Sequence, residues 1–364
     1  MPPQFALCYG TRPQIIKASA VREHLARIGG VLAVDTGQHY DFELNGLLYQ
    51  QLGVKPPDRF LEVGSGSHAE QTSAVLIRTE ALLREHAPAA VVVIGDTNST
   101  LGSALAAAKL RIPLAHVEAG LRARDAYLAE EINRRMVDAV AGLLCAPGPS
   151  AAARLHRERS DATIVDTGDV ARDVLVRCLD QLPDPARLLP SPAPGGYLFA
   201  TLHRAEITSN PALLEAVLEA LGGLPLDAFL ALHPRTRAAL DAAGRYRERI
   251  GRLTLMPPVG YLESLALTRG ASAVVTDSGG LQREAYWLGV PCITVRDETE
   301  WVETVDLGAN RLVAPAAAGD LAAAVQSQLD CWRAGASWDR DAYGRGEAAG
   351  EVARAATAWL ARST

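Results

Sequence analysis

Short apolar runs alternate with longer amphipathic stretches along the first half of the chain. The apolar runs are bounded by Gly or Pro and have the length of strands that are buried on both faces. They span residues 5–9, 31–34, 90–94, 114–117, 143–145 and 163–165. The amphipathic stretches between them are long enough for crossover helices and span residues 15–28, 69–86, 100–110, 130–140 and 150–157. This order predicts a repeated βαβ unit and a parallel sheet.

A proline-rich segment interrupts the pattern. Residues 182–196 contain five prolines, which preclude a regular helix and a central strand. A second series of apolar runs follows at residues 197–202, 229–232, 253–255, 273–275, 292–295 and 312–313. We therefore predict two Rossmann-like, doubly wound α/β domains, residues 1–180 and 181–345, with a C-terminal helix at 346–364 that packs back on the first domain. Ligands of open α/β sheets bind beyond the carboxyl ends of the strands, so the loops of both domains are expected to face one cleft.

Composition narrows the possible partners. The 364 residues are 48% hydrophobic and 21% charged, which is typical of a folded α/β protein. A net charge of −6 provides no basic field, so nucleic acid and an anionic membrane are poor partners. The chain shows no basic and apolar leader and no apolar run of membrane-spanning length, which favours a cytoplasmic location.

The segment from Thr276 to Glu284, which reads Thr-Asp-Ser-Gly-Gly-Leu-Gln-Arg-Glu, has the features of a nucleotide-sugar clamp. Gly279 and Gly280 allow backbone N–H groups to approach an anion, and the start of the following helix adds its positive dipole end. Glu284 lies one turn inside that helix, within reach of a sugar hydroxyl. The alternative is an ordinary strand-to-helix turn, in which Ser278 caps the helix and a glycine supplies a positive φ.

Two cations occur where the first predicted helix begins. Arg12 and Lys17 follow the first strand, although positive charge opposes the dipole at a helix N-terminus. Their position is better explained if an anion such as a phosphate binds there. The alternative is that both are surface charges on a solvated helix.

Carboxylates follow two neighbouring strands in the predicted sheet. Asp96 comes directly after residues 90–94, and Glu118 directly after residues 114–117. Glu130 and its neighbour Glu131 begin the next helix. Crowded carboxylates shift one another's pKa values and can divide the roles of general acid and general base. Alternatively, Asp96 only caps a helix, and the two glutamates only complement a helix dipole.

Other chemistries have weaker signals. A metal site that joins these carboxylates to His116 lacks Asp-x-Asp or His-x-x-x-His spacing, so we predict none. No Gly-x-Gly-x-x-Gly follows the first strand and no Walker motif appears, which argues against NAD binding and ATP hydrolysis. In the second half, His203-Arg204 and His233-Pro234-Arg235 each place a histidine and an arginine at a strand end, where they can contact a diphosphate.

Taken together, these motifs resemble those of the non-hydrolysing UDP-N-acetylglucosamine 2-epimerases. The matching segments are Gly-Thr-Arg-Pro at 10–13, Gly-Asp-Thr at 95–97, His-Val-Glu-Ala-Gly-Leu-Arg at 116–122, Glu-Glu-Ile-Asn-Arg at 130–134, Asp-Ser-Gly-Gly-Leu-Gln at 277–282 and Tyr-Gly-x-Gly at 343–346. The resemblance implies the two-domain glycosyltransferase-B fold and a homodimer. It also implies interconversion of UDP-GlcNAc and UDP-ManNAc through elimination of UDP to 2-acetamidoglucal, with no redox cofactor.

Site roles follow from the same resemblance. It implies that Asp96, Glu118 and Glu130 are the acid and base carboxylates and that His203 assists the departing UDP. Substrate binding is carried over to Arg12, Lys17, Arg134, His233, Ser278, Gly279, Gly280 and Glu284, with the diphosphate on Arg12, Ser278 and Gly279 and the ribose on Glu284.

Departures from the family pattern leave the substrate and its regulation open. Family members usually have Glu at Gln14, Pro at Ala129 and Asp at Arg345. In relatives, Gln14 and the segment 38–40 lie near a second UDP-GlcNAc site that activates some bacterial enzymes, so activation is in doubt. Segments 37–41, 258–261 and 300–304 resemble the branch that acts on diacetamido-uronic UDP sugars. The remaining alternatives are a hydrolysing epimerase, a glycosyltransferase of the same fold and a non-catalytic nucleotide-sugar sensor.

Overall fold

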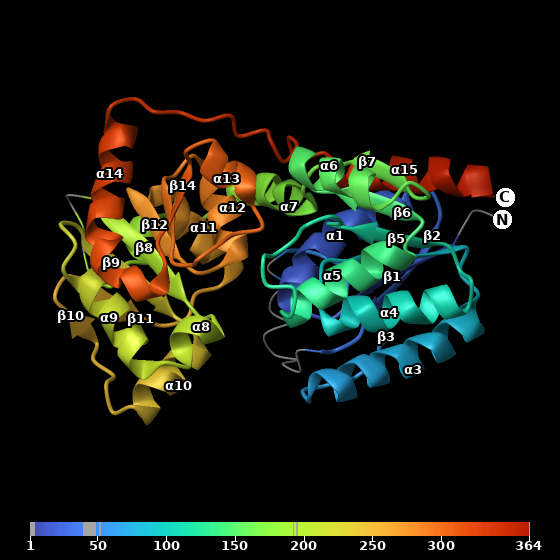
Figure 1. Ribbon diagram of the computed structural model, residues 1–364, viewed down its shortest axis with the longest axis horizontal. Coiled ribbons are helices and arrows are strands. Elements are labelled where there is room, and N and C mark those ends of the chain that lie inside the picture. The colour runs from blue at the N-terminus through green and yellow to red at the C-terminus, as the bar shows by residue number, and fades with distance from the viewer. Residues whose placement is uncertain (1–3, 39–48, 51, 192, 194–195, 364) are drawn as a thin grey trace. The chain divides into compact units, whose positions relative to one another are not determined.

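The computed structural model describes residues 4–38, 49–50, 52–191, 193 and 196–363. The chain divides into two compact units, Met1–Cys178 with Asp341–Thr364 and Leu179–Arg340 (Figure 1). Within the described residues, each unit is built on a seven-stranded sheet with helices on both faces. The prediction of two doubly wound α/β domains is confirmed.

Unit 1 holds a parallel sheet in the order β3-β2-β1-β4-β5-β6-β7. Its strands are β1 (Gln4–Tyr9), β2 (Gly30–Asp35), β3 (Arg59–Phe60), β4 (Ala90–Ile94), β5 (Leu114–Val117), β6 (Leu143–Ala146) and β7 (Thr163–Asp166). Its helices are α1 (Arg12–Ala26), α3 (His68–His86), α4 (Asn98–Lys109), α5 (Ala129–Val140), α6 (Pro149–Glu158), α7 (Val170–Cys178) and α15 (Ala348–Ser363). Helices α1, α7 and α15 pack together, as do α3, α4 and α5 (Figure 1). Every residue of β4 is buried, as its all-apolar sequence requires.

Unit 2 has the sheet order β10-β11-β9-β8-β12-β13-β14. Its strands are β8 (Tyr197–Leu202), β9 (Asp227–Leu232), β10 (Arg249–Ile250), β11 (Leu253–Met256), β12 (Ala273–Thr276), β13 (Cys292–Thr294) and β14 (Asn310–Leu312). Its α-helices are α8 (Ala205–Thr208), α9 (Pro211–Gly222), α10 (Pro234–Ala242), α11 (Tyr261–Gly270), α12 (Gly279–Leu288), α13 (Val302–Asp306) and α14 (Leu321–Arg333). Short 3₁₀ turns span Leu179–Gln181, Pro185–Arg187 and Pro315–Asp320. Strand β10 pairs antiparallel with β11, whereas the other strand pairs are parallel.

Element boundaries differ from the sequence prediction at a few points. Strands β3 and β10 have two residues each and carry too few side chains for a periodic signal. Helix α1 begins at Arg12, three residues before the predicted start, and Pro13 lies in its first turn. The earlier start is stabilised by Gln14, whose Oε1 accepts hydrogen bonds from the backbone N–H groups of Gly10 and Thr11.

Each sheet reverses its strand order at one point. In unit 1 the reversal lies between β1 and β4, and in unit 2 between β8 and β12. Loops diverge to opposite faces of the sheet at such a point and leave a crevice at the carboxyl ends of the strands. The sequence-predicted site residues follow these central strands, so each unit presents its candidates at the expected edge of its own sheet.

Candidate active site

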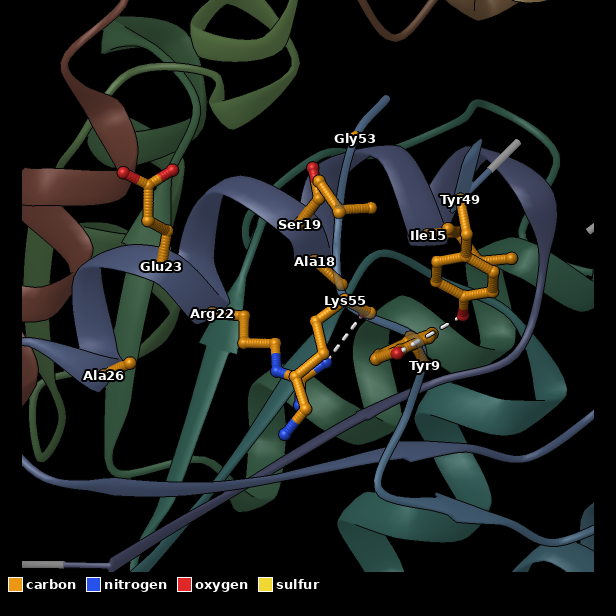
Figure 2. A pocket seen from close by; sticks show the side chains of 11 residues that line it. Tyr9, Ile15, Ala18, Ser19, Arg22, Glu23, Ala26, Tyr49, Gly53 and Lys55 are labelled. Carbon is orange, nitrogen blue, oxygen red and sulfur yellow. Dashed lines mark hydrogen bonds between the residues drawn. The ribbon is translucent and has the colours of Figure 1, made fainter. Parts of the chain in front are cut away.

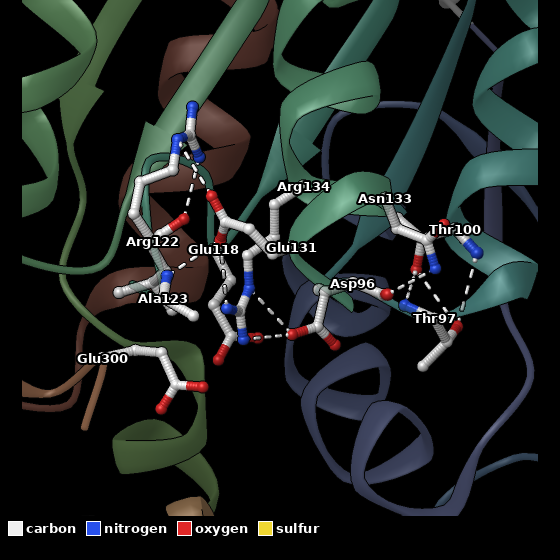
Figure 3. A network of polar contacts seen from close by, with 12 residues as sticks. Asp96, Thr97, Thr100, Glu118, Arg122, Ala123, Glu131, Asn133, Arg134 and Glu300 are labelled. Atoms are coloured by element: carbon white, nitrogen blue, oxygen red, sulfur yellow. Dashed lines mark hydrogen bonds and ion pairs between the residues drawn. The ribbon is translucent and has the colours of Figure 1, made fainter. Parts of the chain in front are cut away.

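Asp96 and Glu118 lie at the ends of neighbouring strands, as the sequence predicted. Strands β4 and β5 pair in register, with Ile94 opposite Val117. The two carboxylates therefore emerge at one edge of the sheet in unit 1, together with side chains from α5 (Figure 3). Both strands are buried throughout, which fixes their ends and hence the separation of the two acids.

Glu118 forms a buried ion pair with Lys17 of α1. The Lys17 Nζ atom contacts Glu118 Oε2, and the side chains are 10% and 8% exposed, respectively. Both side chains have lost most of their water, so each charge is compensated mainly by the other. Glu118 also has φ +71°, a conformation that a non-glycine residue adopts only when its surroundings enforce it. Strain of this kind is concentrated at functional sites.

Asp96 is held by Arg134 from α5. Its Oδ2 atom accepts hydrogen bonds from Arg134 Nε at 3.0 Å and Nη2 at 2.6 Å (Figure 3). Asn133 Nδ2 donates to the Asp96 backbone carbonyl at 2.9 Å. With 29% of its side chain exposed, Asp96 remains accessible to a ligand while Arg134 fixes its orientation. Its alternative role as a helix cap is wrong, because Thr97 is the N-cap of α4 and accepts from Thr100 N.

The two adjacent glutamates of α5 have different environments. Glu131 is fully buried, and its carboxylate accepts from the backbone N–H of Ala123 at 2.8 Å and from Arg135 Nε at 2.7 Å. Glu130 is exposed and makes no hydrogen bond or ion pair to another described residue. The structure therefore brings Glu131 into the charged network that also contains Asp96 and Arg134, and leaves Glu130 at the helix start.

Gln14 fastens the loop after β1 to the loop after β4. Its Nε2 atom donates to the carbonyl of Ile94 at 2.6 Å and lies 3.0 and 2.9 Å from the hydroxyl oxygens of Thr97 and Thr100. This departure from the family pattern is thus a buried structural amide. Of the segments 38–40 and 37–41, residues 39–41 lie outside the described residues. Gln38 is described, and its Oε1 accepts from the backbone N–H of Ser99.

Arg12 is the first residue of α1 and is half-buried. Lys17 lies one and a half turns further on and points to Glu118, so the structure places these two cations in different surroundings. Arg12 makes no hydrogen bond or ion pair within the part of the chain that the structure describes. It is therefore available to bind an anion at the helix start.

In unit 2, the Asp-Ser-Gly-Gly segment forms the start of α12. Ser278 is the N-cap, and its Oγ accepts from Leu281 N at 3.4 Å. The structural role proposed for Ser278 is confirmed, but the positive φ is not, since neither Gly279 nor Gly280 has one. Both glycines are the first helical residues, where their N–H groups have no intrahelical acceptor and can bind an anion. Glu284 lies in the second turn and is half-buried.

His203 and His233 lie beside each other at the ends of β8 and β9, with ring centroids 5.3 Å apart. His203 Nδ1 lies 3.0 Å from Asp277 Oδ1, and Asp277 Oδ2 accepts from the backbone N–H groups of His203 and Arg204, each at 2.7 Å. Burial alone raises the pKa of Asp277, but the His203 hydrogen bond and charge, with these N–H groups, lower it below its usual value.

Sequence reasoning missed the residues that hold the candidates in place. Two of them are Asp277, which belongs to the Asp-Ser-Gly-Gly motif, and Asp138 of α5. Both are buried aspartates, at a strand end or inside a helix. A charged residue in an otherwise apolar setting is the only sequence signal for such a position, and it does not name the partner.

A separate cavity in unit 1 contains none of the predicted site residues. It measures about 390 Å³ and lies between one face of α1 and residues 49 and 53–55, with Tyr9 and Tyr49 in its wall (Figure 2). The lining residues Ile15, Ser19 and Arg22 belong to one side of α1, whereas Lys17 lies on the opposite side at 100° per residue. The cavity is therefore distinct from the carboxylate cluster.

The described residues contain no cluster of three or more His, Cys, Asp or Glu side chains that could hold a metal ion. Among the described helices, none combines the length and apolar composition needed to cross a membrane.

The family is established by comparison with known proteins. A sequence profile described as UDP-N-acetylglucosamine 2-epimerase matches residues 29–357. This chain belongs to the UDP-N-acetylglucosamine 2-epimerase family. It is accordingly an epimerase that acts on UDP sugars, and both the resemblance inferred from the motifs and the glycosyltransferase-B-like fold are confirmed.

Individual relatives of this epimerase differ in substrate. A UDP-2,3-diacetamido-2,3-dideoxy-D-glucuronate 2-epimerase of Pseudomonas aeruginosa is 40% identical over 94% of this chain and 96% of its own length. A UDP-N-acetylglucosamine 2-epimerase of Methanococcus maripaludis is 37% identical over 85% of this chain and 87% of its own length. The crystal structure of Methanocaldococcus jannaschii UDP-GlcNAc 2-epimerase with UDP-GlcNAc and UDP has a TM-score of 0.89 and 35% identity, and covers 98% of this chain and 99% of that chain.

Proposed function

We propose that this protein is a non-hydrolysing 2-epimerase that interconverts UDP-GlcNAc and UDP-ManNAc. The observation that carries the proposal is the pair of carboxylates at adjacent strand ends, each fixed by its own cation: Glu118 by Lys17 and Asp96 by Arg134. Inversion at C2 requires proton transfer on both faces of one carbon. Two separately oriented carboxylates supply the two groups that this needs.

In the proposed reaction, a carboxylate removes the proton from C2 while the bond between C1 and the UDP oxygen breaks. The electron pair of the C2–H bond forms the C1–C2 double bond of 2-acetamidoglucal, and the bond electrons from C1 leave with UDP. In the reverse sense, UDP adds to C1 and a second carboxylate delivers a proton to the other face of C2. Protons and electrons balance, so the route needs no redox cofactor.

We assign the residues to this reaction as follows. Asp96, Glu118 and Glu130 are the acid and base candidates, and Arg134 and Lys17 hold the first two and line the sugar site. The diphosphate binds His203, Arg12, Ser278, Gly279 and Gly280, with His233 beside them and Glu284 at the ribose. The helix start at Ser278 and the ring pair of His203 and His233 support a site for negative charge.

A second substrate has specific support. The Pseudomonas aeruginosa relative carries the name of a diacetamido-uronic epimerase and matches almost the full length of this chain. Its named substrate has the same UDP group and differs on the sugar. The 2-epimerisation proposed here would proceed at the same C1 and C2 atoms.

The test is incubation of the purified protein with UDP-GlcNAc, and separately with the diacetamido-uronic UDP sugar, in D₂O without NAD. NMR follows the sugar H1 and H2 signals. Deuterium at C2 together with the 2-epimer identifies the substrate. Free ManNAc and UDP would point to hydrolysis, and binding without deuterium incorporation would favour the sensor. Transfer of the sugar to an added acceptor would favour the glycosyltransferase.

We also propose a homodimer formed through α5. Ile132, Met136 and Val140 are spaced four residues apart on this helix, and all are about two-fifths exposed. Because the spacing is symmetric about Met136, an antiparallel copy of α5 places Ile132 opposite Val140 of the second chain. We expect Met136→Glu to give monomers in analytical ultracentrifugation. Val176→Glu, at an equally exposed apolar residue of α7, is the control. A monomeric wild type would refute the proposal.

A further inference from the structure

In the amino-acid sequence, His116 lies between the two proposed catalytic carboxylates, Asp96 and Glu118. Its side chain is fully buried. It lies on β5, two residues before Glu118. Its Nδ1 atom lies 2.7 Å from Asp138 Oδ1, and its Nε2 atom lies 2.8 Å from the carbonyl oxygen of Gly95. Both partners are acceptors, so both ring nitrogens must donate. The hydrogen-bond pattern thus assigns the doubly protonated, positively charged ring.

Asp138 of α5 binds the loop that follows Glu118. Its Oδ2 atom accepts from the backbone N–H of Gly120 at 3.1 Å and from Arg122 Nη1 at 2.7 Å. Burial alone raises the pKa of Asp138, but hydrogen bonds and charges from His116 and Arg122 outweigh it and lower the pKa. Arg154 of α6 donates to the carbonyl of Gly120 at 2.9 Å, so the Gly120 residue is held from both sides.

The backbone around the two carboxylates is held by the same groups. Gly95, which precedes Asp96, donates its N–H to Val117 O at 3.0 Å and accepts at its carbonyl from His116. On the other strand, the N–H of Ala119 donates to Cys145 O at 3.0 Å. Gly95 and Glu118 have φ of +70° and +71°. For Glu118 this conformation is strained and persists only because its neighbours hold it.

We propose that His116 and Asp138 form a buried charged pair of positioning residues that fixes the backbone of Asp96 and Glu118 relative to each other. The proposal rests on the catalytic roles proposed above for those two carboxylates. His116 connects the end of β4 to β5, and Asp138 connects β5 and its loop to α5. Neither side chain touches the sugar in this role.

The charged groups that face the pair come from three elements. Arg122 of the loop contacts Asp138, and it also lies 3.9 Å from Glu131 of α5 and 2.5 Å from Glu158 of α6. Arg154 of α6 approaches the same loop, and Arg159, the C-cap of α6, donates to the backbone carbonyl of Asp138. An uncharged residue at position 138 would therefore leave Arg122 with Glu131 and Glu158, and His116 without an anion.

Two variants separate charge from shape. Asp138→Ala leaves His116 Nδ1 and Gly120 N without an acceptor, and we expect kcat to fall by about 10²-fold with KM changed less than about threefold. In Asp138→Asn, the amide NH₂ can donate to Nδ1 of a neutral His116 while its oxygen accepts from Gly120 and Arg122. We expect this variant to retain most activity at pH 8. Its activity should be lost as the pH falls through about 6.5, where an ordinary histidine gains a proton.

The matched control is Asp330→Asn, an exposed aspartate of α14 that lies 3.8 Å from Arg333, for which we expect the wild-type pH profile. UDP binding, measured by calorimetry, should change less than threefold in all three variants. A pH profile of Asp138→Asn that parallels the wild type would overturn the proposal, because a merely structural contact would lower activity equally at every pH.

A second measurement does not depend on turnover. ¹⁵N-histidine NMR of the wild type, with His116→Gln to assign the signals, should show both ring nitrogens of His116 protonated from pH 6 to 8. A neutral ring at pH 7 would overturn the proposal. If the wild type turns over no UDP sugar, the proposed function fails, whereas these spectra still decide whether the charged pair exists.

Discussion

In each unit, one side chain crosses the point at which the strand order of the sheet reverses. The two side chains differ in charge. In unit 1 the side chain of Gln14, from the first turn of α1, reaches across the reversal point and donates to Ile94 O at the end of β4. In unit 2 the side chain of Asp277, from the end of β12, reaches across the corresponding point and accepts from His203 N and Arg204 N after β8. A neutral amide thus links the two central strands of the sheet in unit 1, whereas a carboxylate links them in unit 2.

The two units also differ in how the buried charges at the sheet edge are compensated. Because Gln14 is neutral, the buried charges at the edge of unit 1 are paired among themselves, as in Lys17 with Glu118 and Arg134 with Asp96. In unit 2 the buried carboxylate orients a histidine and two backbone N–H groups. We therefore expect changes in the two ion pairs of unit 1 to lower turnover and changes at Asp277 in unit 2 to weaken UDP binding.

The largest expected effect is that of Glu118→Gln. Loss of the carboxylate removes one proton-transfer group, and we expect turnover to fall by about 10³-fold while UDP binding survives. Rates by NMR and affinity by calorimetry test this. Glu80→Gln, an exposed i,i+4 partner of Arg84, is the control. Near-normal turnover of Glu118→Gln would refute its assignment.

The counterpart in unit 2 is Asp277→Ala. The N–H groups of His203 and Arg204 then lose their acceptor, at about 1–3 kcal/mol for an unsatisfied buried group. We expect UDP affinity to fall by about 10- to 100-fold, with a smaller change in kcat at saturating substrate. Asp277→Asn keeps an acceptor oxygen and should bind UDP within severalfold of the wild type. Unchanged UDP affinity of Asp277→Ala would contradict the proposed role of Asp277 in UDP binding.

Gln14→Glu, which introduces the residue usual in the family, tests the contribution of the neutral Gln14 amide. A carboxylate at this position accepts from Gly10 and Thr11 but cannot donate to Ile94 O, so we expect a loss of about 2 kcal/mol in unfolding free energy at pH 8. Urea unfolding monitored by circular dichroism measures it. The loss should shrink at low pH, where a protonated Glu regains a donor, and a pH-independent loss would contradict this explanation.

Asp35→Asn tests a second buried aspartate, whose partners differ from those of Asp277. Unlike Asp277, Asp35 has uncharged partners, Gly37 N at 2.8 Å and Tyr49 Oη at 3.3 Å, and burial raises its pKa to about 6 although both hydrogen bonds oppose this. A raised folded-state pKa means that its stabilising contribution is full below about 4 and lost as the pH rises through 6.

The neutral Asn avoids that loss. We expect Asp35→Asn to be more stable than the wild type by about 1–2 kcal/mol at pH 8, with no difference at pH 4. Unfolding free energies of the two proteins across this pH range test the sign. A variant that is less stable than the wild type at pH 8 would show that the ionised carboxylate is needed there.

Most strands of the two sheets could be predicted because they are short apolar runs. Residues 197–202, for example, form β8 within the predicted limits. Strands β3 and β10 could not be, since two residues have no periodicity. Adjacent acids such as Glu130 and Glu131 look alike in the sequence, and only the direction of each side chain from α5 separates the exposed one from the buried one.

The sequence by itself determined the alternation of strands and helices, the family, and the residue types at the strand ends, because hydrophobic periodicity and short motifs are local properties. Tertiary structure alone decided the pairings: Lys17 with Glu118, Arg134 with Asp96, and Asp138 with His116. The partners in these pairs lie between 22 and 101 residues apart, so their choice depends on strand order and helix packing. A charge is stabilised in a protein interior only by a neighbour in space, and no local pattern specifies that neighbour.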